Sequence, residues 1–500
     1  MNGPQTRETL ANEIWRACDV LRRDNNCGGI MEYIEHLAWL LFLKFLDAQE
    51  DEWEMQAKLS GQSYQPILDR DYRWNNWASK EMPADDLLSL VHARLIPYLQ
   101  NIGGDPLRDT IRSVFAERNV IVCASGYNLK DVLSIINGID FHTQDDIFTV
   151  SQIYEELLRR MGSENRSAGE IYTPRPVVRF IVELVNPQIG ETVYDPASGT
   201  CGFLAQSYMW MKGKERTIED HNLLQGQTFF GQEKKPVSAL LGVMNMVLHG
   251  VATPRVYRKN TLEENIRQVS DRFDVVVTNP PFGGTEGRHI QQNFPIKAQA
   301  TELLFIQHIM KKLKAKDSVR CGMVVPEGTL FRSGAFADVK KDLLENFNLH
   351  TVVSLPPGTF SPYSDVKTAL IFFDKPGPTK EVWYYELPLP QGLKKFSKGS
   401  PIQDEHFTEA KALWLIWNDY RKGRASRPEP TERSWTVSME DIKAKGYDLT
   451  ARNPNRPAGE QLPSPTEIVA GLMEKEREIM SIVEELDELL SNNQNHGEKP

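Results

Sequence analysis

The sequence lacks any apolar run long enough to cross a bilayer. Its longest, from Leu37 to Leu43, falls far short of the about 18 residues that a membrane-spanning helix requires. Residues 1–30 carry scattered charges and lack the apolar stretch and small-residue cleavage site of a secretory signal. We therefore expect a cytoplasmic protein without a membrane span.

Cysteine is scarce and scattered. The five cysteines are Cys18, Cys27, Cys123, Cys201 and Cys321, and no two of them form a Cys-x-x-Cys pair. An odd number at such spacings argues against a disulfide framework and does not match the usual zinc or redox motifs. We expect reduced, buried thiols and no bound metal ion.

An excess of positive charge is also missing. The chain has 58 Lys and Arg residues against 68 Asp and Glu residues, which gives a net charge of −10. This balance disfavours a module that binds nucleic acid alone, because a polyanion is held mainly by basic side chains. Two lysine clusters, in 311–316 and 394–398, are expected to be solvated faces. Any nucleic-acid role therefore needs a local patch or a basic partner.

The apolar pattern divides the 500 residues into four parts. Leu10, Ile14, Ala17 and Leu21 follow helical spacing, and similar segments predict a helical N-terminal domain over residues 1–145. Residues 146–420 alternate short β-branched runs with helical segments, which predicts a doubly wound α/β fold with a mostly parallel sheet and helices on both faces. The charged, proline-punctuated residues 421–463 indicate a linker and surface segment, and residues 464–500 indicate a C-terminal helix with a polar tail.

A turn that can bind a ligand follows the first expected strand. It reads Asp195-Pro-Ala-Ser-Gly-Thr-Cys-Gly-Phe203, and ligands of open α/β sheets bind beyond the carboxyl ends of the strands. A dinucleotide would place its pyrophosphate here, but Asp195 would repel it and the third glycine of that fingerprint is missing. S-adenosylmethionine carries cationic groups and no phosphate, so the acid favours this methyl donor. Glu233, after the next strand, is the candidate acid for the ribose hydroxyls.

The sharpest motif is Asn279-Pro280-Pro281-Phe282, which ends the expected strand over residues 273–277. The Asn279 carboxamide and a backbone carbonyl held rigid by proline can accept both hydrogens of one exocyclic amino group. This favours attack of the nitrogen lone pair on a methyl sulfonium, with catalysis by positioning and electrostatics. Phe282 offers a flat face for the base. No Pro-Cys dipeptide occurs, so cytosine carbon-5 methylation has no candidate nucleophile.

These motifs together resemble those of the modification (M) subunit of type I restriction-modification systems, a family of N6-adenine DNA methyltransferases. The resemblance implies a Rossmann-like S-adenosylmethionine-dependent fold and base flipping. It also implies that the segment before Pro176 contacts the methionine end of the donor and that the glycine-rich turn binds the donor. Phe360 would stack on the flipped base. The implied cofactor-binding residues are Glu170, Ile171, Tyr172, Thr173, Pro174, Arg175, Asp195, Ser198, Gly199, Thr200, Gly202, Glu233 and Asn260.

Two positions depart from the family pattern. Cys201 stands where glycine is usual, and Asn260 stands where aspartate is common. The Cys201 side chain is compatible with donor binding if it points toward the core, and Asn260 can still hydrogen-bond an adenine ring. We expect activity to survive both changes.

The resemblance also implies partners. These are a specificity (S) subunit that selects the DNA sequence, a restriction (R) subunit, a second M subunit and double-stranded DNA. The helical N-terminal region would then form a clamp around DNA, and the C-terminal helix would contact the S subunit. Two alternatives stay open: a catalytically silent scaffold that binds S-adenosylmethionine, and amino-group methylation of an RNA base or a protein glutamine.

Overall fold

The computed structural model describes residues 7–27, 30–78, 81–115, 123–139, 173–361 and 364–455, with a few isolated positions between 473 and 483. Its contacts divide the chain into a unit that ends at Arg452 and a second unit from Asn453 to Pro500. Few residues of the C-terminal helix expected over 464–500 are described, so that prediction lies largely outside the described residues. Within the described part, no helix combines the length and apolar character needed to cross a membrane.

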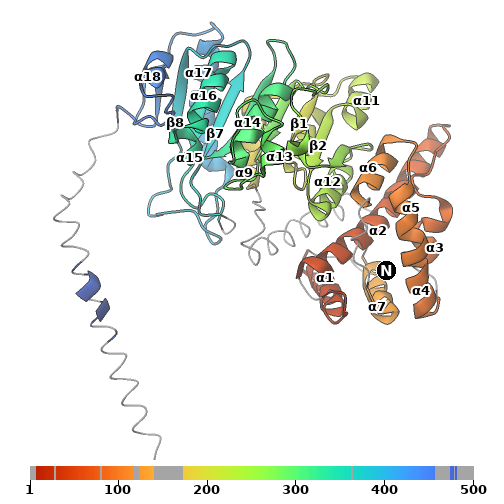
Figure 1. Cartoon of the computed structure of the whole chain (residues 1–500). Helices are drawn as coiled ribbons and strands as arrows, with labels where there is room; N and C mark the ends of the chain where they lie inside the picture. The colour runs from red at the N-terminus through yellow and green to blue at the C-terminus, as the bar shows by residue number, and fades with distance from the viewer. Residues whose placement is uncertain are drawn as a thin grey trace, which may run out of the picture. The chain divides into compact units, whose positions relative to one another are not determined.

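The N-terminal region is helical, as the apolar spacing predicts (Figure 1). The long α2 carries the Leu37–Leu43 run, which is buried among the surrounding helices. Helix α7 begins at a Ser125 cap, whose side chain accepts a hydrogen bond from the Asn128 amide. The elements are α1 (Arg7–Leu21), α2 (Ile30–Leu59), η1 (Arg70–Tyr72), α3 (Trp74–Trp77), α4 (Ala84–Leu90), η2 (Val91–Leu95), α5 (Ile96–Asn101), α6 (Pro106–Phe115) and α7 (Gly126–Asn137).

A mixed sheet of nine strands follows in the part of the chain that the structure describes, in the order β3-β2-β1-β4-β5-β7-β6-β8-β9. The strands β3, β2, β1, β4 and β5 are mutually parallel, whereas β7 runs antiparallel to both neighbours and β9 antiparallel to β8. The strands are β1 (Val193–Asp195), β2 (Phe229–Glu233), β3 (Arg255–Arg258), β4 (Val275–Thr278), β5 (Arg320–Pro326), β6 (Asn348–Ser354), β7 (Thr368–Asp374), β8 (Glu381–Glu386) and β9 (Ser434–Ser438).

Helices bury both faces of this sheet. Along β1 and β4, alternate side chains belong to different hydrophobic clusters: Val193, Val275 and Val277 to one, Tyr194 and Val276 to the other. The first cluster includes residues of α9, α10 and α12, and the second includes residues of α14 and α16. The helices of this part are α9 (Arg175–Val185), α10 (Gly202–Lys212), α11 (Ile218–Gly226), α12 (Pro236–Leu248), η3 (Thr261–Glu263), α13 (Arg288–Gln291), α14 (Thr301–Lys312), α15 (Gly328–Phe331), α16 (Ala335–Asn346), η4 (Asp404–Phe407), α17 (Thr408–Arg421) and α18 (Met439–Ala444).

Residues 421–463 differ from the linker that their composition indicates. They contain β9, which pairs with β8, and α18, which buries Met439 and Ile442. Trp435 of β9 stacks on Tyr384 of β8 with ring centroids 5.6 Å apart. Trp435 and a few apolar residues therefore attach this proline-rich segment to the sheet. The local composition does not predict this attachment, because it depends on pairing with a distant strand.

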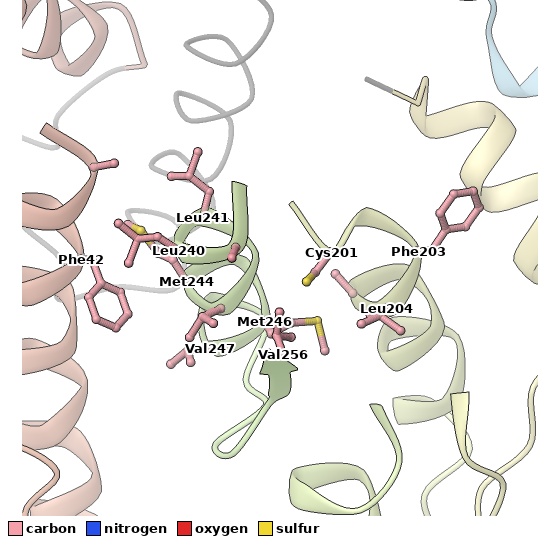
Figure 2. Packing of buried hydrophobic residues seen from close by; sticks show 14 of the residues in the cluster. Phe42, Cys201, Phe203, Leu204, Leu240, Leu241, Met244, Met246, Val247 and Val256 are labelled. Atoms are coloured by element: carbon pink, nitrogen blue, oxygen red, sulfur yellow. The ribbon is translucent and has the colours of Figure 1, made fainter. Parts of the chain in front are cut away.

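Apolar side chains also join α2 to the α/β region. In Figure 2, Phe42 of α2 faces Leu240, Met244 and Val247 of α12, and all four belong to one buried cluster. The Thr110 hydroxyl of α6 adds a buried hydrogen bond of 2.9 Å to the carbonyl of Pro254, just before β3. The helical region and the catalytic-domain sheet thus share one hydrophobic core.

Candidate functional site

Three strand ends converge on one cavity at the carboxyl edge of the parallel half of the sheet. β1 lies between β2 and β4, so the chain order reverses on either side of it, and ligands of open sheets bind at such a switch point. Asp195 ends β1, Glu233 ends β2 and Asn279 follows β4. The cavity has a volume of about 350 Å³, which is in the range of small-molecule sites.

The turn after β1 is held by Glu233. The Glu233 carboxylate accepts hydrogen bonds from the Gly199 amide (2.9 Å) and the Lys235 amide (2.8 Å). Gly199 has a φ of +50°, a left-handed conformation that glycine adopts without a side-chain clash. The candidate ribose acid therefore also shapes the candidate donor loop.

Asp195 is buried at the base of the cavity. Its Oδ1 accepts hydrogen bonds from the Thr278 hydroxyl (2.6 Å) and the Ala197 amide (3.1 Å). Burial raises the pKa of Asp195 to about 7, with a smaller contribution from the nearby Glu233 charge, while the two hydrogen bonds act in the opposite direction. A cationic ligand in the cavity would favour the ionised form.

Cys201 points away from the cavity. It is fully buried, and its sulfur lies toward α12, where a Cβ at Gly242 would come within 2.7 Å of it (Figure 2). Its φ of +60° is a left-handed value, which explains why glycine suits this position and which costs a residue with a side chain roughly 1–2 kcal/mol. The Cys201 side chain thus points toward the core, which is the orientation that leaves room for a donor.

Asn260 lines the cavity and caps the N-terminus of η3. Its Oδ1 accepts a hydrogen bond from the Leu262 amide, and its Nδ2 donates to Glu263 at 3.0 Å. An aspartate would keep the first bond but would repel Glu263, so Glu263 gives asparagine a local advantage here. Thr261 connects this turn to the donor loop, because its hydroxyl donates to the Pro196 carbonyl at 2.6 Å.

The Asn279 carboxamide is oriented by the segment that precedes α9. Its Nδ2 donates to the Thr173 hydroxyl at 2.8 Å, whereas its Oδ1 is buried without a hydrogen-bond partner. A buried amide oxygen without a partner costs about 1–3 kcal/mol, so it is expected to meet a donor when a ligand binds. Pro280 and Pro281 follow directly and, with Asn279, line the same cavity.

The two candidate stacking aromatics lie against each other. The Phe282 ring is half-buried and meets Phe360 edge-on, with centroids 6.4 Å apart and an interplanar angle of 89°. Phe360 is only 1% exposed, because it packs into the hydrophobic core after β6. In this arrangement neither face of Phe360 is open to a base, so stacking there would require repacking.

The cavity gathers most of the candidate site residues. Phe282, Phe360 and Pro174 do not line it, and Glu170, Ile171 and Tyr172 lie outside the described residues. Gly202 allows Arg175 to approach, since a Cβ there would lie 2.8 Å from an Arg175 guanidinium nitrogen. The candidates that line the cavity are Thr173, Arg175, Asp195, Ser198, Gly199, Thr200, Gly202, Glu233, Asn260, Asn279, Pro280 and Pro281.

The sequence motifs missed several lining residues. Lys234 and Lys235 follow Glu233, and Lys259 precedes Asn260, so adjacency to a candidate was the available signal. Thr301 and Phe305 come from α14; their segment resembles one that the family has on the helix beside the site, but an ordinary amphipathic helix explains its pattern equally well. Thr278, which donates a hydrogen bond to Asp195, lies between the expected strand over residues 273–277 and the Asn279 motif, and neither pattern gives it a role.

An acid at the end of β1, a second acid at the end of β2 and an unpartnered Asn279 oxygen after β4 define a class of protein. This is the arrangement expected of a methyltransferase that acts on an amino group, with a donor half and an acceptor half. Comparison with known proteins agrees. The family model "N-6 DNA Methylase" matches residues 143–461, and "HsdM N-terminal domain" matches residues 10–136.

Relatives with similar sequences cover nearly the whole chain. The type I restriction enzyme EcoEI methylase subunit of Escherichia coli is 38% identical, over 96% of this chain and 98% of its own length. A solved chain from a study of type I R-M system assembly is 76% identical with a TM-score of 0.77, covering 98% of this chain and 99% of that one. A modification subunit assigned to a type I restriction enzyme of Vibrio vulnificus YJ016 is 38% identical with a TM-score of 0.81, covering 91% and 99%.

The chain belongs to the N-6 DNA methylase family, among the methylase subunits of type I restriction enzymes. It is an enzyme, an adenine-specific DNA methyltransferase, and its fold is that of S-adenosylmethionine-dependent methyltransferases. The resemblance drawn from the sequence is thus confirmed. The comparisons give no support to methylation of RNA or protein, or to a silent scaffold.

Proposed function

We propose that this chain transfers the methyl group of S-adenosylmethionine to the N6 amino group of adenine in duplex DNA, as the modification subunit of a type I complex whose specificity subunit selects the site. The observation that carries the proposal is the buried Asn279 Oδ1, which faces no donor while its Nδ2 is held by Thr173. An exocyclic amino group supplies the donor that this oxygen lacks.

The donor half of the site is proposed to recognise the cationic groups and the ribose of S-adenosylmethionine. Bound S-adenosylmethionine supplies an electrophilic methyl group on a sulfonium. The Asp195 carboxylate would attract the cationic groups of the donor, and Glu233, which accepts a hydrogen bond from the Gly199 amide, would accept hydrogen bonds from the ribose hydroxyls. Asn260 would hydrogen-bond the adenine ring of the donor, and Arg175, beside Gly202, would contact its methionine end.

The acceptor half is proposed to make the amino nitrogen nucleophilic. Asn279 Oδ1 accepts one amino hydrogen, and the adjacent backbone carbonyl, fixed by the proline ring, accepts the other. The nitrogen lone pair then points at the methyl carbon, and the extra proton leaves to solvent after transfer. The partly exposed ring of Phe282 is the candidate surface for stacking on the base. The Phe360 ring is buried, so a base cannot reach either of its faces.

We also infer the wider arrangement from the family. The specificity subunit, the restriction subunit and a second methylase subunit are the proposed protein partners, and double-stranded DNA is the substrate. Residues 1–145 are the proposed DNA clamp, and residues 464–500 the proposed contact with the specificity subunit. Because chromosomal DNA is the proposed substrate, a cytoplasmic location follows.

A substitution at Asn279 tests the acceptor role. Asn279→Ala should keep donor affinity within about twofold and lower methyl transfer by at least 100-fold, since one oriented hydrogen bond in a transition state contributes about 2.7–4 kcal/mol. The matched control is Asn346→Ala, an exposed asparagine on α16 that bonds only Asp342 among described groups. Undiminished transfer by Asn279→Ala in the complex with its specificity subunit would refute the assignment.

A further inference from the structure

A group of metal-binding side chains lies in the helical N-terminal region, apart from the catalytic cavity. Cys27 follows α1, His36 lies on α2 and Cys123 precedes α7. All three side chains are fully buried, and their ligand atoms lie within 4.8 Å of one another. Three separate segments of the chain thus place two sulfur atoms and one imidazole nitrogen together.

The distances suit a tetrahedral metal ion. Cys27 Sγ lies 3.6 Å from His36 Nδ1, and the Cys27 and Cys123 thiols share a hydrogen bond. With Zn–S of about 2.3 Å and Zn–N of about 2.05 Å, a tetrahedral angle requires a sulfur-to-nitrogen distance of about 3.6 Å and a sulfur-to-sulfur distance of about 3.8 Å. The ligand atoms lie at most 4.8 Å apart, so the longest separation has to shorten by up to about 1.2 Å to reach the sulfur-to-nitrogen distance of a tetrahedral site.

A negative charge lies next to this group and favours a bound cation. The Asp24 carboxylate lies close enough to act electrostatically on both cysteines. Asp24 is itself saturated: it accepts hydrogen bonds from the amides of Asn26, Ala124 and Ser125 and from the Asn128 carboxamide. It therefore adds negative charge without supplying a hydrogen to the sulfur atoms.

We propose that Cys27, His36 and Cys123 bind a zinc ion that ties the turn after α1, the start of α2 and the segment before α7 together. Two sulfur ligands and one imidazole nitrogen are a set that zinc prefers. On binding, each thiol releases its proton to solvent as the sulfur–metal bond forms, and the two thiolates neutralise the ion. The fourth position is left for water or for the Glu32 carbonyl, which lies 3.3 Å from His36 Nδ1.

Metal analysis of the full-length protein, purified without chelators, tests the proposal directly. We expect about one zinc per chain, and after removal of zinc the added Co²⁺ should give the thiolate charge-transfer and intense d–d absorption of a tetrahedral sulfur-containing site. These measurements need no substitution, so they do not depend on a variant that folds.

Substitutions assign the ligands. Cys27→Ala and Cys123→Ala should each lower the zinc content at least tenfold. Cys18→Ala, a buried cysteine of the same helical region outside the group, should leave it unchanged. A wild-type protein with less than a tenth of an equivalent of zinc and no cobalt spectrum would overturn the proposal. So would a Cys27–Cys123 disulfide, seen as the loss of two of the five titratable thiols.

Discussion

Thr278 controls the charge of the candidate donor acid, and Thr278→Val removes that control with little change of shape. The Thr278 hydroxyl donates to Asp195 Oδ1 at 2.6 Å, and both side chains are fully buried. Valine has nearly the same volume but no hydroxyl. The variant therefore leaves Asp195 with one amide donor, from Ala197.

The size of the effect follows from the pKa of Asp195. A hydrogen bond to a charged group contributes about 1.5–3 kcal/mol, and about 1.36 kcal/mol corresponds to one pKa unit. Loss of the Thr278 hydroxyl should therefore raise the pKa of Asp195 from about 7 to between roughly 8 and 9. At pH 7 the ionised fraction falls from about one half to between roughly 1% and 10%, so donor affinity should fall about 5- to 50-fold.

The sign of the pH dependence provides the test. Because ionised Asp195 attracts the cationic donor, affinity should rise with pH through about 7 in the wild type and at a higher pH in Thr278→Val. Calorimetric titration with S-adenosylmethionine between about pH 6 and 9 measures both curves. Thr278→Ser, which keeps the hydroxyl, should follow the wild type. Equal affinities of Thr278→Val and wild type at every pH, or a constant ratio between them, would refute the reasoning.

The two remaining predictions concern the donor loop. Glu233→Gln keeps one acceptor oxygen for two backbone amides and loses the charge, so we expect about tenfold weaker donor binding by calorimetry and an unchanged circular dichroism spectrum. Gly242→Ala brings a Cβ within 2.7 Å of Cys201 Sγ and should lower the free energy of unfolding by about 1–3 kcal/mol. Adding Cys201→Gly should recover part of that loss in denaturant titrations, whereas an equal loss in both variants would contradict this packing account.

The parallel half of the sheet could be predicted because its strands are continuous apolar runs. β1, β2, β4 and β5 fall on short runs of β-branched or other apolar residues, and hydrophobic clusters cover both faces of this part of the sheet. β3 was missed because this edge strand, Arg255 to Arg258, begins and ends with arginine and leaves only two residues for an apolar run. The antiparallel insertion of β7 between β5 and β6 depends on long-range pairing, which strand composition does not encode.

The sequence predicted those site residues that are polar and lie directly after an apolar strand. Asp195, Glu233 and Asn279 were found because a polar residue directly after an apolar strand marks the binding edge of a parallel sheet. Thr278 was not a candidate, because a threonine at a strand end has an ordinary structural role. Phe305 could not be distinguished from a core residue, because an ordinary amphipathic helix explains its position equally well. The buried state of Phe360 depends on its packing partners, which the sequence does not specify.

The central claim is N6-adenine methylation directed by a separate specificity subunit. The most direct measurement is transfer of labelled methyl groups from S-adenosylmethionine to unmethylated DNA, by this chain alone and with the specificity subunit, followed by nucleoside analysis. The account predicts N6-methyladenine with the partner present and little or none without it. A verified complex that binds S-adenosylmethionine but forms no N6-methyladenine, or that methylates another base, would contradict the account.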